Sequence, residues 1–548
     1  MATNIRTIVA ICLSLAVLLL WQVFFTQTTH KKSIEERRDI TRNITTTYNR
    51  DAIIAMGKQK KLRIPFRNRL IEGSINLKGA KIDDLTLLTY NQSNTNSKVH
   101  LLSPVNTKGV YYIEFGWLTF EKKIELPNTN TIWSADKEVL QNSERINLTW
   151  YNQKGTKFII SLFLDQHYMF TIEQFILGEN MKSVKGYSAL TRSSHQIGKN
   201  EMLIHEGGIG VLDNRLSEIS FSDLNKKLRY NFKGKHREWF GFSDKYWLAA
   251  IIPTSNCNVR FISHQDHISQ RYQADVIYDH TFANDKTKNN YQKFLFYVGA
   301  KKLKILDFYM NKYDIKLFDR AVDFGILYFI TKPIFLTLNF FYSLVGNFGV
   351  AILLLTVFFK LLLFPLAYKG FVGMNKIKDL HPEIKRLKCL YNNDQVQLQK
   401  AILTLYRQEK INPMSGCLPA FLQMPVFFAL YKVLYITIEM RQAPFFGWIK
   451  DLSVSDPTNI FNLFGLLSWE PPSFMHIGVL PIIMSGTLIL QQSLNPQSTD
   501  LAQVKIIKFI PFIFLFMFSS FPSGLILYWS WSNILSLIQQ MIIKHISK

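Results

Sequence analysis

One lysine, Lys360, lies near the middle of an apolar run at residues 349–368, which reads GVAILLLTVFFKLLLFPLAY. A run of this length can cross a bilayer as a helix. A lysine at the bilayer centre costs roughly 2.5–3.5 kcal/mol, so such residues usually face a water-filled cavity or a bundle interior. Thr356 lies four residues earlier, on the same helix face. Because the apolar runs contain no Asp or Glu, we expect Lys360 to attract anionic groups that another molecule brings.

Other apolar runs near the C-terminus also contain polar or aromatic side chains. Besides Lys360 and Thr356, we take Gln423, Tyr528, Trp529 and Asn533 as candidates to line a hydrated groove. The alternative is structural, because polar side chains also join membrane helices through hydrogen bonds.

The sequence contains no motif that requires a cofactor or a metal. Its four cysteines form no CxxC pair, and no GxxxxGK[ST] phosphate-binding motif occurs. We therefore predict a protein that is not an enzyme and has neither catalytic residues nor a metal site. Two short clusters, His205-Glu206 and HQDH at residues 264–267, leave open a membrane-anchored enzyme.

Composition indicates a chain that is only partly embedded in membrane. Hydrophobic residues make up 48% of the 548 residues, yet the mean hydropathy is only +0.04. The apolar residues must therefore be concentrated in some regions and diluted by a large polar region. The formal net charge of +24 suits nucleic acid, anionic lipid or the cytoplasmic loops of a membrane protein, and its distribution decides between them.

The chain divides by hydropathy into five parts. Residues 8–25 form an apolar run without a small-x-small cleavage site, which favours an uncleaved anchor over a signal peptide. Short β-type runs separated by Gly, Asn, Asp and Lys predict a large antiparallel β-sandwich after a polar tether. The predicted parts are an N-terminal signal-anchor at 1–25, a tether at 26–60, the sandwich at 61–320, an interfacial amphipathic helix at 321–344, and a core at 345–548 with spans at 349–368, 418–438, 477–494, 506–520 and 523–543.

The orientation follows from charge. The loop at 369–416 contains nine basic and four acidic residues, which marks it as cytoplasmic. With the N-terminus inside and the sandwich outside, that loop is inside only if 324–342 does not cross the membrane. The result is six spans with both termini cytoplasmic, and a seven-span protein is the alternative.

The cytoplasmic loop shows apolar residues at helical spacing on both sides of Asn392-Asn393-Asp394, which predicts an antiparallel helical hairpin. Its basic side chains could form a solvated surface, or could contact lipid headgroups or ribosomal RNA. The contact candidates are Lys385, Arg386, Lys388, Arg407 and Lys410.

Four motifs closely resemble one family, the YidC-type membrane-protein insertases, and look like its α-proteobacterial branch. They are GNFG at 346, INPMSGCLPAFLQMPVFFALY at 411–431, EMRQAPFFGWIKDLS at 439–453 and FPSGLILYWSWSN at 521–533. The outer region matches more weakly through GSINLKGAKIDDL, YYIEFGW and FGFSDKYWLAAIIP, which begin at 73, 111 and 240.

The resemblance implies a multi-pass α-helical bundle with five core helices around a groove closed toward the periplasm, and a periplasmic β-super-sandwich. It further implies a bacterial inner-membrane insertase that passes segments of nascent membrane proteins into lipid, alone or with the Sec translocon and its accessory subunits. The partners would also include the ribosome, but not DNA.

Two departures from the family pattern limit what the resemblance implies. Well-studied members carry Arg where this chain has Lys360, which keeps the charge but loses the bidentate guanidinium. Many members end in a long basic tail, whereas this sequence stops at Lys548, so we expect the ribosome to contact the hairpin. A secondary transporter or channel with Lys360 as its anion site is the alternative function.

Overall fold

The structure is a computed structural model that describes residues 49–546, except 93–96, 108, 122–123, 179–182, 194–204, 266–269, 283–290, 326, 392–393, 410–417, 468, 470, 472–475 and 495–500. The predicted anchor at 1–25 and most of the tether lie outside these residues. The described residues fall into two compact units, an outer unit up to Asp323 and a membrane unit from Phe324 onward.

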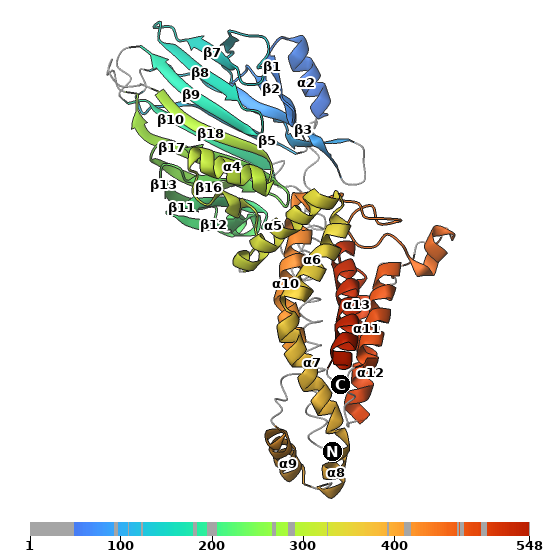
Figure 1. The fold of residues 1–548 in the computed structure, drawn as a ribbon. Helices are drawn as coiled ribbons and strands as arrows, with labels where there is room; N and C mark the ends of the chain where they lie inside the picture. Colours follow the sequence, from blue (N-terminus) through green and yellow to red (C-terminus); the bar gives the residue numbers. More distant parts are fainter. Residues whose placement is uncertain are drawn as a thin grey trace, which may run out of the picture. The chain divides into compact units, whose positions relative to one another are not determined.

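The outer unit is built on two sheets, each with nine described strands that pair antiparallel (Figure 1). The first has the order β1-β2-β3-β5-β10-β17-β16-β13, with β4 paired to β3 beside this path. Its strands are β1 (Arg63–Arg67), β2 (Ile71–Asn76), β3 (Lys81–Asn91), β4 (Lys98–Leu102), β5 (Tyr111–Leu118), β10 (Lys185–Ser193), β13 (Arg229–Gly234), β16 (Cys257–Gln265) and β17 (Gln270–Thr281).

The second sheet has the order β12-β11-β14-β15-β18-β9-β8-β7-β6. Its strands are β6 (Ser134–Ala135), β7 (Arg145–Tyr151), β8 (Lys157–Leu164), β9 (Met169–Leu177), β11 (Gly207–Leu212), β12 (Arg215–Ser220), β14 (Trp239–Ser243), β15 (Trp247–Pro253) and β18 (Tyr291–Ala300).

Aromatic side chains join the two sheets face to face. The ring of Phe115 on β5 lies 6.0 Å from that of Phe294 on β18, and the ring of Trp117 lies 5.2 Å from that of Phe158 on β8. Such edge-to-face pairs bury large apolar area between layers about 10 Å apart. The predicted sandwich is therefore confirmed. Short helices complete the unit: α2 (Arg50–Gln59), α3 (Phe221–Lys226), α4 (Leu303–Tyr313) and η1 (Phe318–Ala321).

One of these helices lies where the sequence predicts only a polar tether. Helix α2 covers residues 50–59 of the predicted tether, and the side chain of Asn49 caps it by accepting a hydrogen bond from the Asp51 N–H. Arg50 then pairs with Asp84 on β3. Tertiary contact and a local cap, rather than apolar periodicity, thus define this helix.

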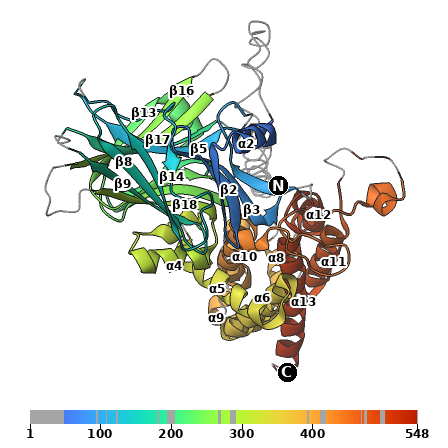
Figure 2. The ribbon, with the colours of Figure 1, turned by 90° about the horizontal axis from the view of Figure 1, so that it is seen from above.

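The membrane unit is helical (Figures 1 and 2). Helix α13 packs against α6 and α11, α11 packs against α12, and α5 packs against α6 and α10. Its described elements are α5 (Tyr328–Val345), α6 (Phe348–Leu362), α7 (Phe364–Asp379), α8 (His381–Leu390), α9 (Gln395–Gln408), α10 (Leu418–Ile436), η3 (Ile438–Met440), η4 (Ile460–Gly465), α11 (Val479–Leu494), α12 (Leu501–Phe518) and α13 (Ser523–Ile546).

Length and composition allow few of these helices to cross a membrane as single straight spans. Among the described residues, α5 is long and apolar enough, and α6 with α7 passes the same test as a pair bent by 67°. Three shorter apolar stretches lie within other predicted spans: Gln423–Ile436, Val479–Ser493 and Ile507–Phe518. Helix α5 covers most of the segment predicted to lie along the interface, so its crossing would give the seven-span alternative.

The predicted span at 349–368 is not one straight helix. It breaks at Leu363, whose N–H still donates to the Phe359 carbonyl at 2.9 Å. Pro365 follows in the first turn of α7 and has no N–H to continue the hydrogen-bond ladder. Lys360 therefore lies in the last turn of α6, beside the bend.

Candidate functional site

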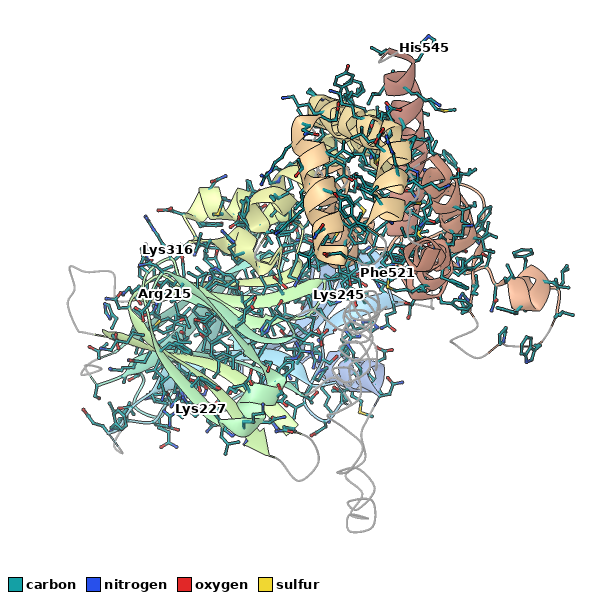
Figure 3. All side chains as sticks on the ribbon, turned by 90° about the horizontal axis from the view of Figure 1, so that it is seen from below. Arg215, Lys227, Lys245, Lys316, Phe521 and His545 are labelled. Atoms are coloured by element: carbon teal, nitrogen blue, oxygen red, sulfur yellow. The ribbon has the colours of Figure 1, made fainter. Side chains whose placement is uncertain are left out.

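A cavity of about 400 Å³ opens between helices α6, α7 and α10 to α13 in the membrane unit. Figure 3 shows the side chains of this unit, with Phe521 at the α12–α13 turn and His545 in the last turn of α13. Eight lining residues are polar: Lys360, Gln423, Gln491, Gln492, Ser532, Asn533, Ser536 and Gln540. The others are apolar: Phe371, Met374, Met424, Phe427, Leu488, Ile507 and Trp529.

Helix α13 holds both ends of Lys360. The Lys360 ammonium donates to the Ser536 hydroxyl at 2.7 Å. The Gln539 side-chain amide donates to the Lys360 carbonyl at 3.0 Å, next to the break in α6. Among the described residues Lys360 forms no ion pair, so its charge is solvated by a neutral hydroxyl and by the cavity.

The structure places four of the six predicted groove residues in the cavity wall: Lys360, Gln423, Trp529 and Asn533. Tyr528 lies behind the wall, 2% exposed, and its hydroxyl accepts a hydrogen bond from Gln423. The Asn533 amide donates to the Thr487 hydroxyl on α11 at 3.1 Å, so this residue also joins two helices.

Thr356 does not line the cavity. Its side chain is 1% exposed, and its hydroxyl donates to the Ile352 carbonyl at 2.7 Å within the same helix. A threonine that bonds back to the carbonyl four residues earlier is satisfied without a cavity or a ligand.

Sequence reasoning missed most of a polar stripe on α13. Ser532, Ser536, Gln539 and Gln540 recur at intervals of three and four residues, which places them on one face. Three of them line the cavity and Gln539 reaches Lys360. The helical spacing itself could have identified this stripe. Phe371 and Met374 were missed because the segment after 368 is predicted as loop, whereas α7 continues to Asp379.

The predicted contact candidates lie on two helices. Lys385, Arg386 and Lys388 are on α8, and Arg407 is on α9. The two helices pack against each other, and Ile384 is buried between charged neighbours. Lys410 lies outside the described residues.

The two clusters that suggested an enzyme are only partly described by the structure. His205 contacts the Gly208 carbonyl at 2.8 Å, and His264 lies on β16, whereas Asp266 and His267 are outside the described residues. In the part of the chain that the structure describes, no group of three or more His, Cys, Asp or Glu residues could hold a metal ion.

Comparison with known proteins agrees with this division of the chain. Residues 340–548 match the family described as "60Kd inner membrane protein", and residues 63–337 match the "YidC periplasmic domain". The chain is similar to the membrane protein insertases YidC of Rickettsia conorii (45% identity, 98% of each chain) and Rickettsia bellii (43% identity, 99% of each chain). It belongs to the YidC family of membrane protein insertases.

The family resemblance found in the sequence is thereby confirmed, and membership places the protein among inner membrane proteins with a periplasmic domain. YidC insertases are not enzymes. The chain also aligns with a solved structure of an active YidC insertase at 18% identity, over 88% of this chain and 92% of that one. The TM-score of this alignment is 0.36, which is too low to support a structural conclusion.

Proposed function

We propose that this protein inserts hydrophobic segments of nascent proteins into the inner membrane and that the cavity beside Lys360 receives them. The observation that carries the proposal is the Lys360 ammonium, whose hydrogen-bond partner among the described residues is the Ser536 hydroxyl, in a cavity lined by eight polar residues including Lys360 itself. A cation whose described partner is neutral can exchange that partner for a carboxylate of an incoming chain. The interaction gains strength because the surroundings have a low dielectric constant.

The apolar part of the client supplies the driving force. Transfer of about 20 apolar residues from water to lipid is favourable, and a single pass needs about that length. The cavity would solvate the polar end of the client while its apolar stretch enters lipid. No nucleotide or metal is needed for this step.

The proposed topology is six spans around a five-helix core, with both termini cytoplasmic and the outer unit periplasmic. The α8–α9 hairpin would then be cytoplasmic, where Lys385, Arg386 and Arg407 are exposed and form no ion pair among the described residues. Those charges suit anionic lipid or ribosomal RNA. We include the ribosome and the Sec translocon among the proposed partners.

Charge substitution at Lys360 tests the proposal. Lys360→Arg keeps the cation and should insert a small client with an acidic tail at nearly the normal rate. Lys360→Glu repels that tail and should slow insertion at least about tenfold, equivalent to ~1.4 kcal/mol. Protease protection of the client in proteoliposomes measures the rate.

A client whose tail carboxylates are replaced by amides provides the matched control, because it should lose most of its sensitivity to the charge at position 360. Equal insertion of the acidic client by Lys360→Arg and Lys360→Glu would contradict the charge-capture role. A Lys360-dependent flux of small anions through the same vesicles, without client insertion, would instead support a transporter or channel.

A further inference from the structure

The connection between α10 and α11 ends in a strongly apolar tip. Residues 460–469 (IFNLFGLLSW) contain no charged side chain. The apolar tip, as defined here, consists of six side chains that are between 36% and 84% exposed: Phe461, Leu463, Phe464, Leu466, Leu467 and Trp469. An exposed patch of adjacent large apolar side chains marks an interaction surface rather than a surface adapted to water.

The base of the tip is firmly attached to the bundle. The Ile460 N–H donates to the Ile477 carbonyl at 3.0 Å, just before α11. Asn459, which is 3% exposed, accepts from the Phe461 N–H through its side chain and from the Phe464 N–H through its carbonyl. The exposure of the tip is therefore part of the fold.

The backbone at the tip projects two consecutive apolar side chains outward. Leu463 and Phe464 have φ of +49° and +59°, in the left-handed region that such residues rarely adopt. Each residue pays a steric cost in this conformation, because its Cβ lies too close to the following carbonyl oxygen. Their exposed fractions are 51% and 59%, so packing inside the protein does not offset this cost. A partner outside the protein that buries these two side chains would offset the cost.

The bilayer is the partner that suits this surface. The tip is the short orange helix of Figures 1 and 2, which projects away from α11, α12 and α13. It lies at the end of the bundle opposite α8 and α9, as Figure 1 shows. Large apolar side chains are also exposed on α11 and α12, among them Ile482, Leu490 and Phe512, and such side chains suit contact with lipid in an inner membrane protein. Trp448, in the same connection, is 42% exposed, and tryptophan prefers the membrane interface.

We propose that the apolar tip inserts into the outer leaflet of the membrane, at the boundary between headgroups and acyl chains. Interfacial segments lie roughly 5–10 Å into this boundary. The tip would anchor the α10–α11 connection to the membrane surface beside the bundle. The choice of the outer leaflet rests on the proposed topology, whereas the anchoring role does not depend on the proposed capture of clients at Lys360.

A depth measurement on the full chain tests the inference. The four cysteines are replaced by serine, and Leu466→Cys, at the 84% exposed position, is labelled with the fluorophore NBD. Lys450→Cys, exposed in the same connection but outside the tip, is the matched control. Both proteins are reconstituted into vesicles of phosphatidylethanolamine and phosphatidylglycerol, and are quenched by lipids spin-labelled near the headgroup or by aqueous iodide.

We expect blue-shifted emission at position 466 that the spin-labelled lipid quenches and iodide does not, with the reverse at position 450. Adding Phe464→Glu and Leu467→Glu should return position 466 to water, while unchanged hydrogen exchange in α11 shows that the fold persists. Iodide quenching at position 466 in the unmodified tip would overturn the inference. So would blue-shifted emission that neither quencher reaches, or that rises with the protein-to-lipid ratio, because a protein or a second copy then covers the tip.

Discussion

Lys301, which directly follows β18, is a buried lysine of the outer unit and is not part of the cavity beside Lys360. It is 5% exposed, and its ammonium donates to the Ser243 hydroxyl at 3.1 Å. Burial lowers the pKa of Lys301 to about 8, although the carboxylate of Asp244 opposes the shift. Between pH 8 and the ordinary lysine pKa of 10.5, the unfolded chain binds a proton that the folded chain does not. The contribution of Lys301 to the free energy of unfolding must therefore rise with pH in this window.

We expect urea unfolding of the outer unit in the full chain to show this contribution as a difference between the native protein and Lys301→Met, which lacks the titrating group. That difference should grow by about 2 kcal/mol between pH 8 and 10, at ~1.4 kcal/mol per pKa unit with allowance for overlap of the two titrations. Identical slopes for the two proteins would contradict the assignment. Buried tyrosines with raised pKa values, such as Tyr278, oppose the rise near pH 10, because the unfolded chain then loses phenol protons that the folded chain keeps. This effect is the same in both proteins and cancels in the difference between them.

The energetic cost of burying a polar group explains which site residues could be predicted from the sequence. Lys360 was predictable because a cation in a membrane span is so unfavourable that it usually faces a cavity or a bundle interior. Thr356 was not, because a hydroxyl can bond to its own helix and then needs nothing else. Gln539 acts on the Lys360 carbonyl only because α6 breaks there, and no local pattern predicts that contact across 179 residues.

At the scale of elements, α11 begins at a cap that is distant in sequence. Asp456, 1% exposed, accepts from the Leu480 N–H at 2.8 Å, and the Thr458 hydroxyl accepts from the Val479 N–H at 3.0 Å. These bonds satisfy two N–H groups in the first turn of α11 that have no partner within the helix. Sequence patterns predict caps next to a helix, so this one could not be found.

Asp456→Ala should destabilise the α10–α11 connection by ~1–3 kcal/mol, because it removes the buried acceptor of a helix N–H. Hydrogen exchange should accelerate in the first turn of α11. Asp451→Ala is the control, since Asp451 accepts only from Ser453 in the bonds described and leaves α11 untouched. Equal acceleration by the two substitutions would show that Asp456 does not cap this helix.

At the scale of the whole molecule, hydropathy predicted the two units because burial in water and burial in lipid require different compositions. It could not predict the order of the strands. Neighbours such as β5, β10 and β17 are far apart in sequence, and pairing between them depends on the assembled sandwich. In the helical unit, local apolar runs indicate where helices lie, but not the break at Leu363 within the run at 349–368.

The division into units also predicts how function is divided. Every cavity residue lies between Lys360 and Gln540, and none comes from the outer unit. Deleting residues 61–320 should therefore leave insertion of the acidic client close to the rate of the full chain, measured by protease protection in proteoliposomes. Lys360→Glu in the shortened chain should still slow it. Loss of insertion from a shortened chain whose α11 and α13 retain normal hydrogen exchange would assign an essential step to the sandwich, as a membrane-anchored enzyme or a client-binding domain requires.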